Sequence, residues 1–336
     1  MLLAKGISKT YTVKEKEKFF SFSKKREIEA LKHLDITIEP GKITGLLGIN
    51  GAGKSTTIKI LSSILEPTTG TVEVDGIDAI LHPQRVKKMV NVITGGERNL
   101  YWRLSARENL EYFGALYGLS KKELNLYIDY SLALVGLKDT KTPVERYSKG
   151  MKQRLQIARG LINDPKYLFL DEPTLGLDVS IAKELRHYIK KLSKVEKKGI
   201  LLTTHYLSEV EELCDWVYII NQGELLMEGS PSDIISKVIP ETNLKVIVES
   251  STLKLKQELK EYTNMKHARL HTVEENGITT ITISAKEDIT SDVVTIISNH
   301  GVSILSFKTE DSNLEDALLA LTNREGDKEY ELVKSS

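Results

Sequence analysis

A glycine-rich segment near the start of the chain has the residue types and spacing of a phosphate-binding loop. Residues 48–55 read Gly-Ile-Asn-Gly-Ala-Gly-Lys-Ser, with glycines at the first and sixth positions followed by lysine and serine. Glycine lets backbone N–H groups turn toward phosphate oxygens, and the start of a following helix adds positive potential. Lys54 is expected to reach the outer phosphates, and the Ser55 hydroxyl to ligate Mg²⁺. The predicted nucleotide-binding set is Gly48, Ile49, Asn50, Gly51, Ala52, Gly53, Lys54, Ser55 and Thr56.

A second candidate lies where an apolar run meets two carboxylates. Residues 167–170 are typical of a buried strand, and Asp171 and Glu172 follow directly. Open α/β sheets bind ligands beyond the carboxyl ends of their strands. Asp171 is therefore expected to hold Mg²⁺ through water, and Glu172 to polarise the water that attacks the terminal phosphate. An acidic pair alone is weak evidence, but together with the upstream loop it becomes specific.

Alternating strands and helices must position these residues. The pattern predicts strands at the start of the chain, around the glycine loop and before the acidic pair, with amphipathic helices between them. This alternation indicates an α/β fold with a largely parallel sheet. A helical subdomain is expected at about residues 98–160. The expected strands are 2–7, 34–38, 42–48, 167–170 and 200–204, and the expected helices are 56–61, 107–117, 121–135, 151–161, 181–195 and 207–214.

Length and composition narrow the class of protein. A chain of 336 residues favours one principal domain with a smaller one. The 47 Lys and Arg residues balance 47 Asp and Glu residues, so the strong basic field of a free-standing nucleic-acid binder is missing. The single cysteine, Cys214, rules out an internal disulfide framework and favours the cytoplasm. No apolar run approaches the roughly 20 residues of a spanning helix, so any membrane role is expected to act through another protein.

The segment at residues 14–26 is charged at both ends and aromatic in the middle. Charged connections are usually solvated, which favours an extended hairpin. The alternative is a membrane-proximal contact, with Phe19, Phe20 and Phe22 facing apolar surface and the basic residues facing lipid phosphates. The sequence leaves both interpretations open.

Together with residues 147–154, these motifs resemble those of an ABC-type ATPase over about residues 1–240. The resemblance implies a P-loop NTPase fold with a mostly parallel sheet, antiparallel N-terminal strands and a helical subdomain. It also implies ATP hydrolysis with ATP and Mg²⁺ as ligands. The segment matching residues 147–151 is the family signature, which contacts the terminal phosphate of ATP held on a partner subunit.

The same resemblance assigns roles to individual residues. Glu172, His205 and Lys54 form the implied catalytic set, with His205 as the switch histidine that meets a phosphate oxygen. Tyr11 matches the aromatic residue that stacks on adenine. The alternatives without a nucleotide are that His205 is an ordinary histidine at the end of a strand and that Tyr11 only packs against neighbouring residues. The residues implied to act on the partner's ATP are Ser148, Gly150 and Asp178.

The chain also departs from the family pattern. Gly96 stands where the family usually has a glutamine, so no side chain there can ligate Mg²⁺ or carry the contact to the membrane partner. Neighbouring Glu97 could substitute, or the ion could keep an extra water. In the signature, Tyr147, Lys149 and Met151 replace the usual Leu, Gly and Gln. These changes bear on rate and coupling more than on ATP binding.

A second domain is expected after a linker at residues 240–243. Residues 241–322 alternate as a small βαββαβ unit without a catalytic constellation, and residues 323–336 form a polar tail that is expected to be mobile. The stretch 312–322 resembles the C-terminal extension of ATPases that serve ABC-2-type drug and lipid exporters.

The leading hypothesis is therefore the ATP-hydrolysing subunit of an ABC-2-type exporter. Its expected partners are membrane permease subunits and a second ATPase subunit, either another copy or a related chain, with no nucleic acid. The expected location is the inner face of the cell membrane, reached through the permease. The alternatives are a soluble ABC-family ATPase acting on ribosomes or nucleic acid, and a regulatory binder that holds ATP without hydrolysis, which the retained Glu172 argues against.

Overall fold

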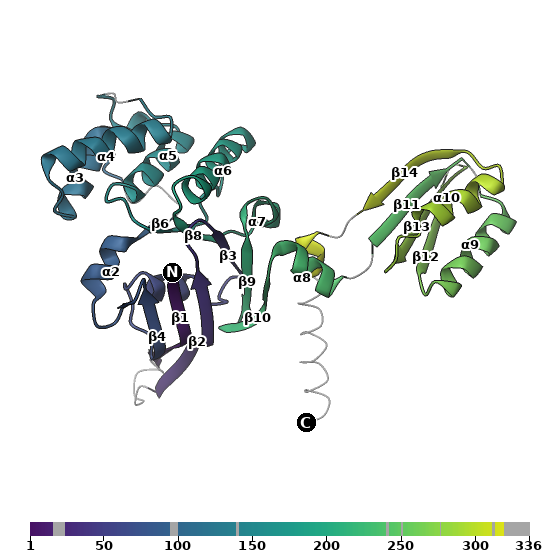
Figure 1. Ribbon diagram of the computed structural model, residues 1–336, viewed down its shortest axis with the longest axis horizontal. Helices are drawn as coiled ribbons and strands as arrows, with labels where there is room; N and C mark the ends of the chain where they lie inside the picture. The colour runs from purple at the N-terminus through teal and green to yellow at the C-terminus, as the bar shows by residue number, and fades with distance from the viewer. Residues whose placement is uncertain are drawn as a thin grey trace. The chain divides into compact units, whose positions relative to one another are not determined.

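The computed structural model describes residues 1–15, 24–94, 100–138, 141–239, 242–249, 251–275, 277–310 and 313–318. The chain divides into two compact units, Met1–Pro231 and Ser232–Ser336 (Figure 1). The sequence pattern instead predicts a boundary near residue 240. The difference is helix α8 (Pro231–Val238), nearly all of which groups with the second unit.

A six-stranded sheet in the first unit positions the residues that the sequence predicts to bind and hydrolyse a nucleotide. Its strand order is β10-β9-β3-β8-β7-β6, and every neighbouring pair is parallel except β9 and β10. All residues of β3 and β8 are buried, as expected for central parallel strands covered on both faces. The strands are β3 (Ile43–Leu47), β6 (Val90–Thr94), β7 (Tyr167–Asp171), β8 (Gly199–Thr203), β9 (Trp216–Asn221) and β10 (Glu224–Gly229).

A four-stranded antiparallel sheet of order β2-β1-β4-β5 accompanies it. One apolar core joins buried residues of both sheets with Ile58, Ile60 and Leu61 of helix α1 (Lys54–Leu61), so α1 is covered on its apolar side. The predicted fold class is confirmed. The strands are β1 (Leu2–Glu15), β2 (Lys24–Ile38), β4 (Thr69–Val74) and β5 (Ile77–Asp78).

Helices α3, α4 and α5 gather on one side of this unit, away from the antiparallel strands (Figure 1). Ser105 caps α3 and Ser120 caps α4, each with a glutamate three residues later that completes a capping box. The helices of the unit are α2 (Pro83–Met89), α3 (Ala106–Leu116), α4 (Lys121–Leu134), α5 (Lys149–Gly160), α6 (Val179–Lys194) and α7 (Leu207–Leu213), with a short 3₁₀ turn at Val144–Arg146.

Strands β1 and β2 extend into the charged N-terminal segment from both sides. They pair as far as Glu15 and Lys24, as an extended hairpin requires. Residues 16–23, with the three phenylalanines of the alternative interpretation, lie outside the described residues.

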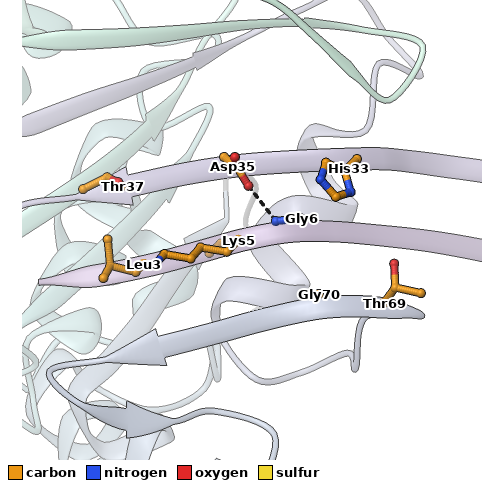
Figure 2. Close-up of a pocket in the computed structure, with 9 residues that line it drawn as sticks. Leu3, Lys5, Gly6, His33, Asp35, Thr37, Thr69 and Gly70 are labelled. Carbon is orange, nitrogen blue, oxygen red and sulfur yellow. Dashed lines mark hydrogen bonds between the residues drawn. The ribbon is translucent and has the colours of Figure 1, made fainter.

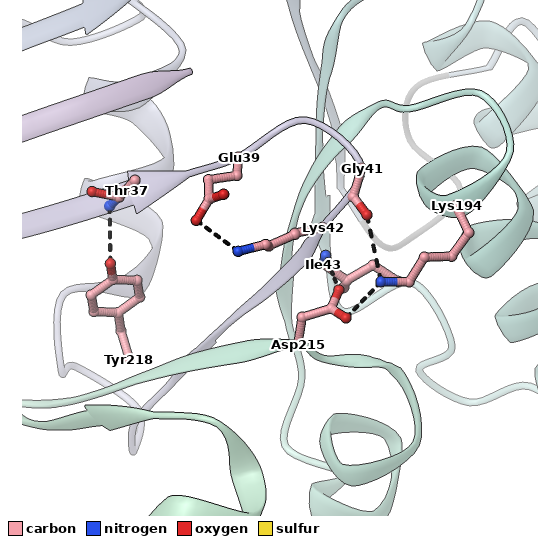
Figure 3. Close-up of polar contacts among 8 residues, drawn as sticks. All are labelled: Thr37, Glu39, Gly41, Lys42, Ile43, Lys194, Asp215 and Tyr218. Carbon is pink, nitrogen blue, oxygen red and sulfur yellow. Dashed lines mark hydrogen bonds and ion pairs between the residues drawn. The ribbon is translucent and has the colours of Figure 1, made fainter.

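The amino end of β3 is fixed by an ionic cluster (Figure 3). The backbone N–H of Ile43 donates to Asp215 Oδ2 at 2.8 Å, and Lys194 Nζ donates to Asp215 Oδ1 at 2.5 Å. Nearby, the backbone N–H of Thr37 donates to the Tyr218 hydroxyl at 3.0 Å. The two Asp215 bonds connect the start of β3 to the start of β9 and to α6, and the Thr37–Tyr218 bond joins β2 to β9. The other end of β3 leads into the glycine loop.

A second polar cluster joins β4 to β7 through Asp75. Lys166 Nζ and the Tyr167 hydroxyl donate to the two Asp75 oxygens at 2.6 and 2.8 Å, and the amino group of Met1 also contacts Asp75. Burial alone would raise the pKa of Asp75, but these hydrogen bonds favour the charged form and lower it to about 2. The cluster contributes to the scaffold and not to the nucleotide site.

The second unit contains a four-stranded antiparallel sheet of order β12-β13-β11-β14. Its element order is β-α-β-β-α-β, and buried residues of α9 and α10 form one core with those of β11 and β13. The elements are β11 (Thr242–Val248), α9 (Leu253–Met265), β12 (Arg269–Glu275), β13 (Ile278–Ala285), α10 (Thr290–Asn299) and β14 (Ile304–Glu310).

Candidate functional site

The glycine loop lies between β3 and α1, and its shape excludes side chains at two positions. A Cβ at Gly48 would lie 2.3 Å from the carbonyl oxygen of Ile220. A Cβ at Gly53 would lie 2.6 Å from Leu31 Cδ2, and Gly53 also has φ of 107°. Gly51 has φ of 88° with open space around it, so it is required by conformation and not by crowding. The loop therefore has the tight, backbone-lined shape that phosphate binding needs.

Neighbouring strands brace the loop from outside. The backbone N–H of Gly223, in the β9–β10 turn, donates to the Ala52 carbonyl at 3.1 Å. The Gly223 carbonyl in turn accepts a hydrogen bond from the Lys32 N–H at 2.8 Å. Strand β2 and the β9–β10 turn thus fix the loop before any ligand binds.

Lys54 extends over the loop from the start of α1. Its Nζ donates to the carbonyl oxygens of Gly48 at 2.6 Å and Ile49 at 3.1 Å. Burial lowers the pKa of Lys54, opposed by the carboxylates of Glu172 and Asp171. The ammonium group therefore shares one electrostatic environment with the acidic pair, which the sequence places more than a hundred residues away.

The acidic pair lies at the carboxyl end of β7, beside the end of β8: Asp171 is the last residue of the strand and Glu172 follows it. The Thr203 hydroxyl donates to Asp171 Oδ1 at 2.5 Å, and the Glu172 N–H donates to the Thr203 carbonyl at 3.0 Å. Glu172 has φ of 53°, a conformation that a non-glycine residue rarely adopts. Such outliers cluster at functional sites. Thr203 therefore orients the Asp171 carboxylate through its hydroxyl and fixes the backbone of Glu172 through its carbonyl.

His205 lies against Glu172 at the same edge. Its Nδ1 is 2.7 Å from Glu172 Oε2, and about half of its side chain is exposed. The Thr204 hydroxyl, which accepts from the Tyr206 N–H at 3.0 Å, shapes the turn that presents this histidine. The structure thus brings together three residues of the predicted catalytic set: Lys54, Glu172 and His205.

Ser55 and Asp171 are the residues that could hold Mg²⁺. A hydroxyl and a carboxylate are hard oxygen donors of the kind that this ion prefers, and Ser55 is exposed at the start of α1. Thr56 follows on the same helix turn and is half-buried. The donor set fits a magnesium ion bound together with nucleotide phosphates.

Tyr11 lies on β1 and is paired with Ile28 of β2. Two residues further along β2, the Ala30 carbonyl packs on Gly53, with 2.8 Å to the position of a Gly53 Cβ. The Tyr11 ring is partly exposed, with Lys9 Nζ 5.8 Å from its centre. Adenine stacking stays a prediction, placed on a strand that adjoins the glycine loop.

The signature segment begins helix α5. Tyr147 is buried at 5% exposure, where an apolar residue would serve equally. Ser148 is exposed and is the N-cap, accepting from the Met151 N–H at 3.2 Å. A Cβ at Gly150 would lie 2.7 Å from Ile181 Cδ1, so glycine lets α5 pack closely on α6. Asp178 is exposed and is the N-cap of α6 without a side-chain cap bond.

Three supporting residues were not among the predicted site residues: Thr203, Gly223 and Leu31. The predicted parallel sheet gives a signal for Thr203. This residue ends the strand beside the one that carries Asp171, two residues before His205. Nothing local in the sequence marks Gly223 or Leu31, because their contacts depend on tertiary packing. Gly96 and Glu97 lie outside the described residues.

A groove of about 590 Å³ on the antiparallel sheet is separate from this set (Figure 2). It is lined by residues of β1, β2 and β4, and the Gly6 N–H donates to Asp35 Oδ1 at 2.6 Å within it. A Cβ at Gly6 would lie 2.9 Å from the His33 ring. None of the predicted site residues lines the groove.

A glycine loop, an acidic pair and a histidine at the carboxyl edge of a parallel sheet define a P-loop nucleotide-binding domain.

The profile of the family described as ABC transporter matches residues 31–175. The ABC transporter ATP-binding protein NatA of Bacillus subtilis (strain 168) is 42% identical over 208 residues, covering 62% of this chain and 84% of NatA. The linearmycin resistance ATP-binding protein LnrL of the same organism is 32% identical over 327 residues, covering 96% and 99%.

The chain belongs to the family of ABC transporter ATP-binding proteins, as an ATP-binding and ATP-hydrolysing subunit. A bacterial ABC transporter cassette solved as a dimer is 26% identical with a TM-score of 0.59, covering 68% of this chain and 98% of that one. Within the described part of the chain, no helix combines the length and apolar character needed to cross a membrane.

Proposed function

We propose that this chain powers an ABC-2-type exporter from the inner face of the cell membrane. Two copies close head to tail over two ATP molecules, and permease subunits convert closing and opening into alternating access. LnrL, which is similar along almost its whole length, is named as a resistance protein. Resistance through a transporter requires outward movement of the toxic compound, which favours export over uptake.

Within one copy, each residue at the sheet edge has a defined task. Lys54 binds the outer phosphates with a preformed loop beneath it, and Tyr11 stacks on adenine. Glu172 accepts a proton from the attacking water. Glu172 itself is positioned by the Thr203 carbonyl, which accepts from its N–H, and by the His205 ring. His205 then meets the terminal phosphate. Ser55 and Asp171 hold Mg²⁺, which neutralises charge on the phosphates when bound.

The single observation that carries the two-copy proposal is the position of Ser148. This residue is exposed at the start of helix α5, where it caps the helix, and none of the hydrogen bonds found in the described residues joins it to Lys54, Glu172 or His205. Large apolar side chains are also exposed in the glycine loop and next to Asp178: Ile49 is 58% exposed and Val179 is 84% exposed. In the proposed dimer, a second copy would cover these apolar side chains and remove them from water. A second copy supplies Ser148, Gly150 and Asp178 across the ATP.

Dimer formation tests the two-copy site. The Glu172→Gln chain with Mg·ATP is expected to sediment as a dimer, because binding persists while hydrolysis is slow. The matched control is Glu172→Gln with Lys54→Ala, which loses the phosphate contact and is expected to remain a monomer. A monomer at every ATP concentration for Glu172→Gln would contradict the proposal.

Partner capture tests the exporter. Tagged chain purified from gently solubilised membranes is expected to carry a polytopic membrane protein in a fixed ratio. Retention on ribosomes or nucleic acid instead would support the soluble ABC-family alternative. An unrelated cytoplasmic protein with the same tag controls for adventitious capture.

A further inference from the structure

Lys149 is the residue of the signature segment that departs most in chemistry from the family pattern. It is the first residue of α5, between Ser148 and Gly150, and its side chain is exposed. The family resemblance implies glycine at this position. A lysine here adds a positive charge beside two residues that are proposed to contact phosphate.

The Lys149 ammonium group lies against the loop that leads into α6. A Cβ at Gly176 would lie only 2.2 Å from Lys149 Nζ, so the ammonium sits directly over the Gly176 backbone. Gly176 has φ of 68°, which favours glycine for conformation as well. Gly176 lies two residues before Asp178, which is also proposed to act on the partner's ATP. Lys149 thus connects the two segments of one subunit that approach that nucleotide.

The charge of Lys149 is not neutralised within the described part of the chain. No carboxylate there lies within ion-pair distance of its Nζ, and the first turn of α5 contains no acidic residue. The other basic residues of this helix behave differently. Arg154 pairs with Glu184, and Lys152 lies 5.0 Å from the centre of the Trp102 ring.

We propose that Lys149 is an ATP-binding residue that acts on the nucleotide held by a second copy. It adds a charge-assisted hydrogen bond to the phosphates, beside the contacts of Ser148 and Gly150. Such bonds to charged groups are stronger than those between neutral groups. The inference rests on the proposed head-to-tail dimer and assigns part of its affinity to a residue that the usual signature lacks.

Sedimentation of full-length Glu172→Gln chain with Mg·ATP tests the assignment. Adding Lys149→Gln removes the charge and keeps most of the length, and should weaken ATP-driven dimerisation by about ten-fold or more. Lys149→Arg should retain dimerisation within a few-fold. Lys152→Gln, one turn along the same helix, is the matched control and should dimerise like the parent. Dimerisation of Lys149→Gln should also depend less on salt, because one phosphate contact per site is lost.

A second measurement separates trans binding from a structural role. ATP affinity of the monomeric Lys149→Gln chain, measured below the dimerisation range with a fluorescent ATP analogue, should equal that of the parent. Unchanged dimerisation of Lys149→Gln, or an equal loss for Lys152→Gln, would overturn the role of Lys149 and leave the dimer intact. If the parent itself fails to dimerise, the two-copy site fails and the inference with it.

Discussion

The glycine loop and the signature segment both combine small residues with a helix start, yet they are completed in different ways. The glycine loop is braced within its own chain, by Gly223 and by residues of β2, and its lysine already lies over its carbonyls. The signature segment presents exposed Ser148 and Lys149, and none of the hydrogen bonds or ion pairs found in the described part of the chain joins them to the glycine loop. In the proposed dimer, the glycine loop of one copy forms one half of the ATP site, and the signature segment of the second copy covers it. Mutations should therefore separate ATP binding from ATP turnover.

The largest expected effect comes from Glu172, where the two segments must cooperate. Glu172→Gln should lower ATP turnover by about 10²–10⁴, since it removes the proposed general base, while ATP affinity is preserved. Steady-state phosphate release and equilibrium ATP binding measure the two properties. Glu211→Gln, on the exposed side of α7, is the matched control and should turn over normally. Near-normal turnover in Glu172→Gln would remove Glu172 from its assigned role.

A smaller effect is expected when the glycine loop is distorted. Gly48→Ala places a Cβ 2.3 Å from the Ile220 carbonyl, a backbone atom that cannot move aside easily. Overpacking of about 1–3 kcal/mol at the loop should weaken ATP binding by roughly ten- to a hundred-fold. Titration calorimetry measures this affinity. Gly76→Ala, with φ of 79° but open space around it and outside the nucleotide site, should leave affinity unchanged. Equal affinities of Gly48→Ala and the parent would show that the loop tolerates a wider shape.

Distortion of the signature segment should lower ATP turnover without changing the ATP affinity of the monomer. Gly150→Ala places a Cβ 2.7 Å from Ile181 Cδ1 and should push α5 away from α6. Turnover should fall roughly five- to ten-fold, by analogy with overpacking of about 1 kcal/mol, with ATP affinity of the monomer unchanged. Ile181→Val removes the crowding methyl group, so the double variant should recover part of the loss. A drop in monomer ATP affinity would instead mean that the two segments are not separable.

The same contrast explains what the sequence could predict. The glycine loop, the acidic pair and the buried strands can be predicted from the sequence, because each depends on the types and spacing of residues within one short segment. The contact of His205 with Glu172 cannot be derived from the sequence without the register of β7 and β8. The sequence predicts a domain boundary near residue 240, whereas the compact units of the structure divide after Pro231, so that α8 groups with the second unit. The bracing by Gly223 depends on the β9–β10 turn reaching the loop, which no local pattern encodes.

The smallest expected effect lies outside both segments and measures the scaffold alone. Asp75 has a pKa lowered to about 2 by Lys166, the Met1 amino group and Tyr167. A carboxylate with a lowered folded-state pKa stabilises the fold above its unfolded pKa of about 4, and this contribution disappears as the pH falls toward 2. Asp75→Asn should therefore lower the free energy of unfolding by about 1–2 kcal/mol at pH 7, after allowance for solvent screening, and by less near pH 3.

Urea unfolding at the two pH values measures the difference for Asp75→Asn, with exposed Glu111→Gln on α3 as the carboxyl-to-amide control. ATP affinity at neutral pH should be unchanged, because the Asp75 cluster joins β4 to β7 through Lys166 and Tyr167, at the amino end of β7 and not at the carboxyl end that leads to Glu172. A destabilisation of Asp75→Asn that persists undiminished near pH 3 would mean that side-chain shape, and not charge, holds the cluster together. A matching loss of ATP affinity would mean that the scaffold and the half-site are coupled, so that weak binding in Gly48→Ala could no longer be assigned to the loop alone.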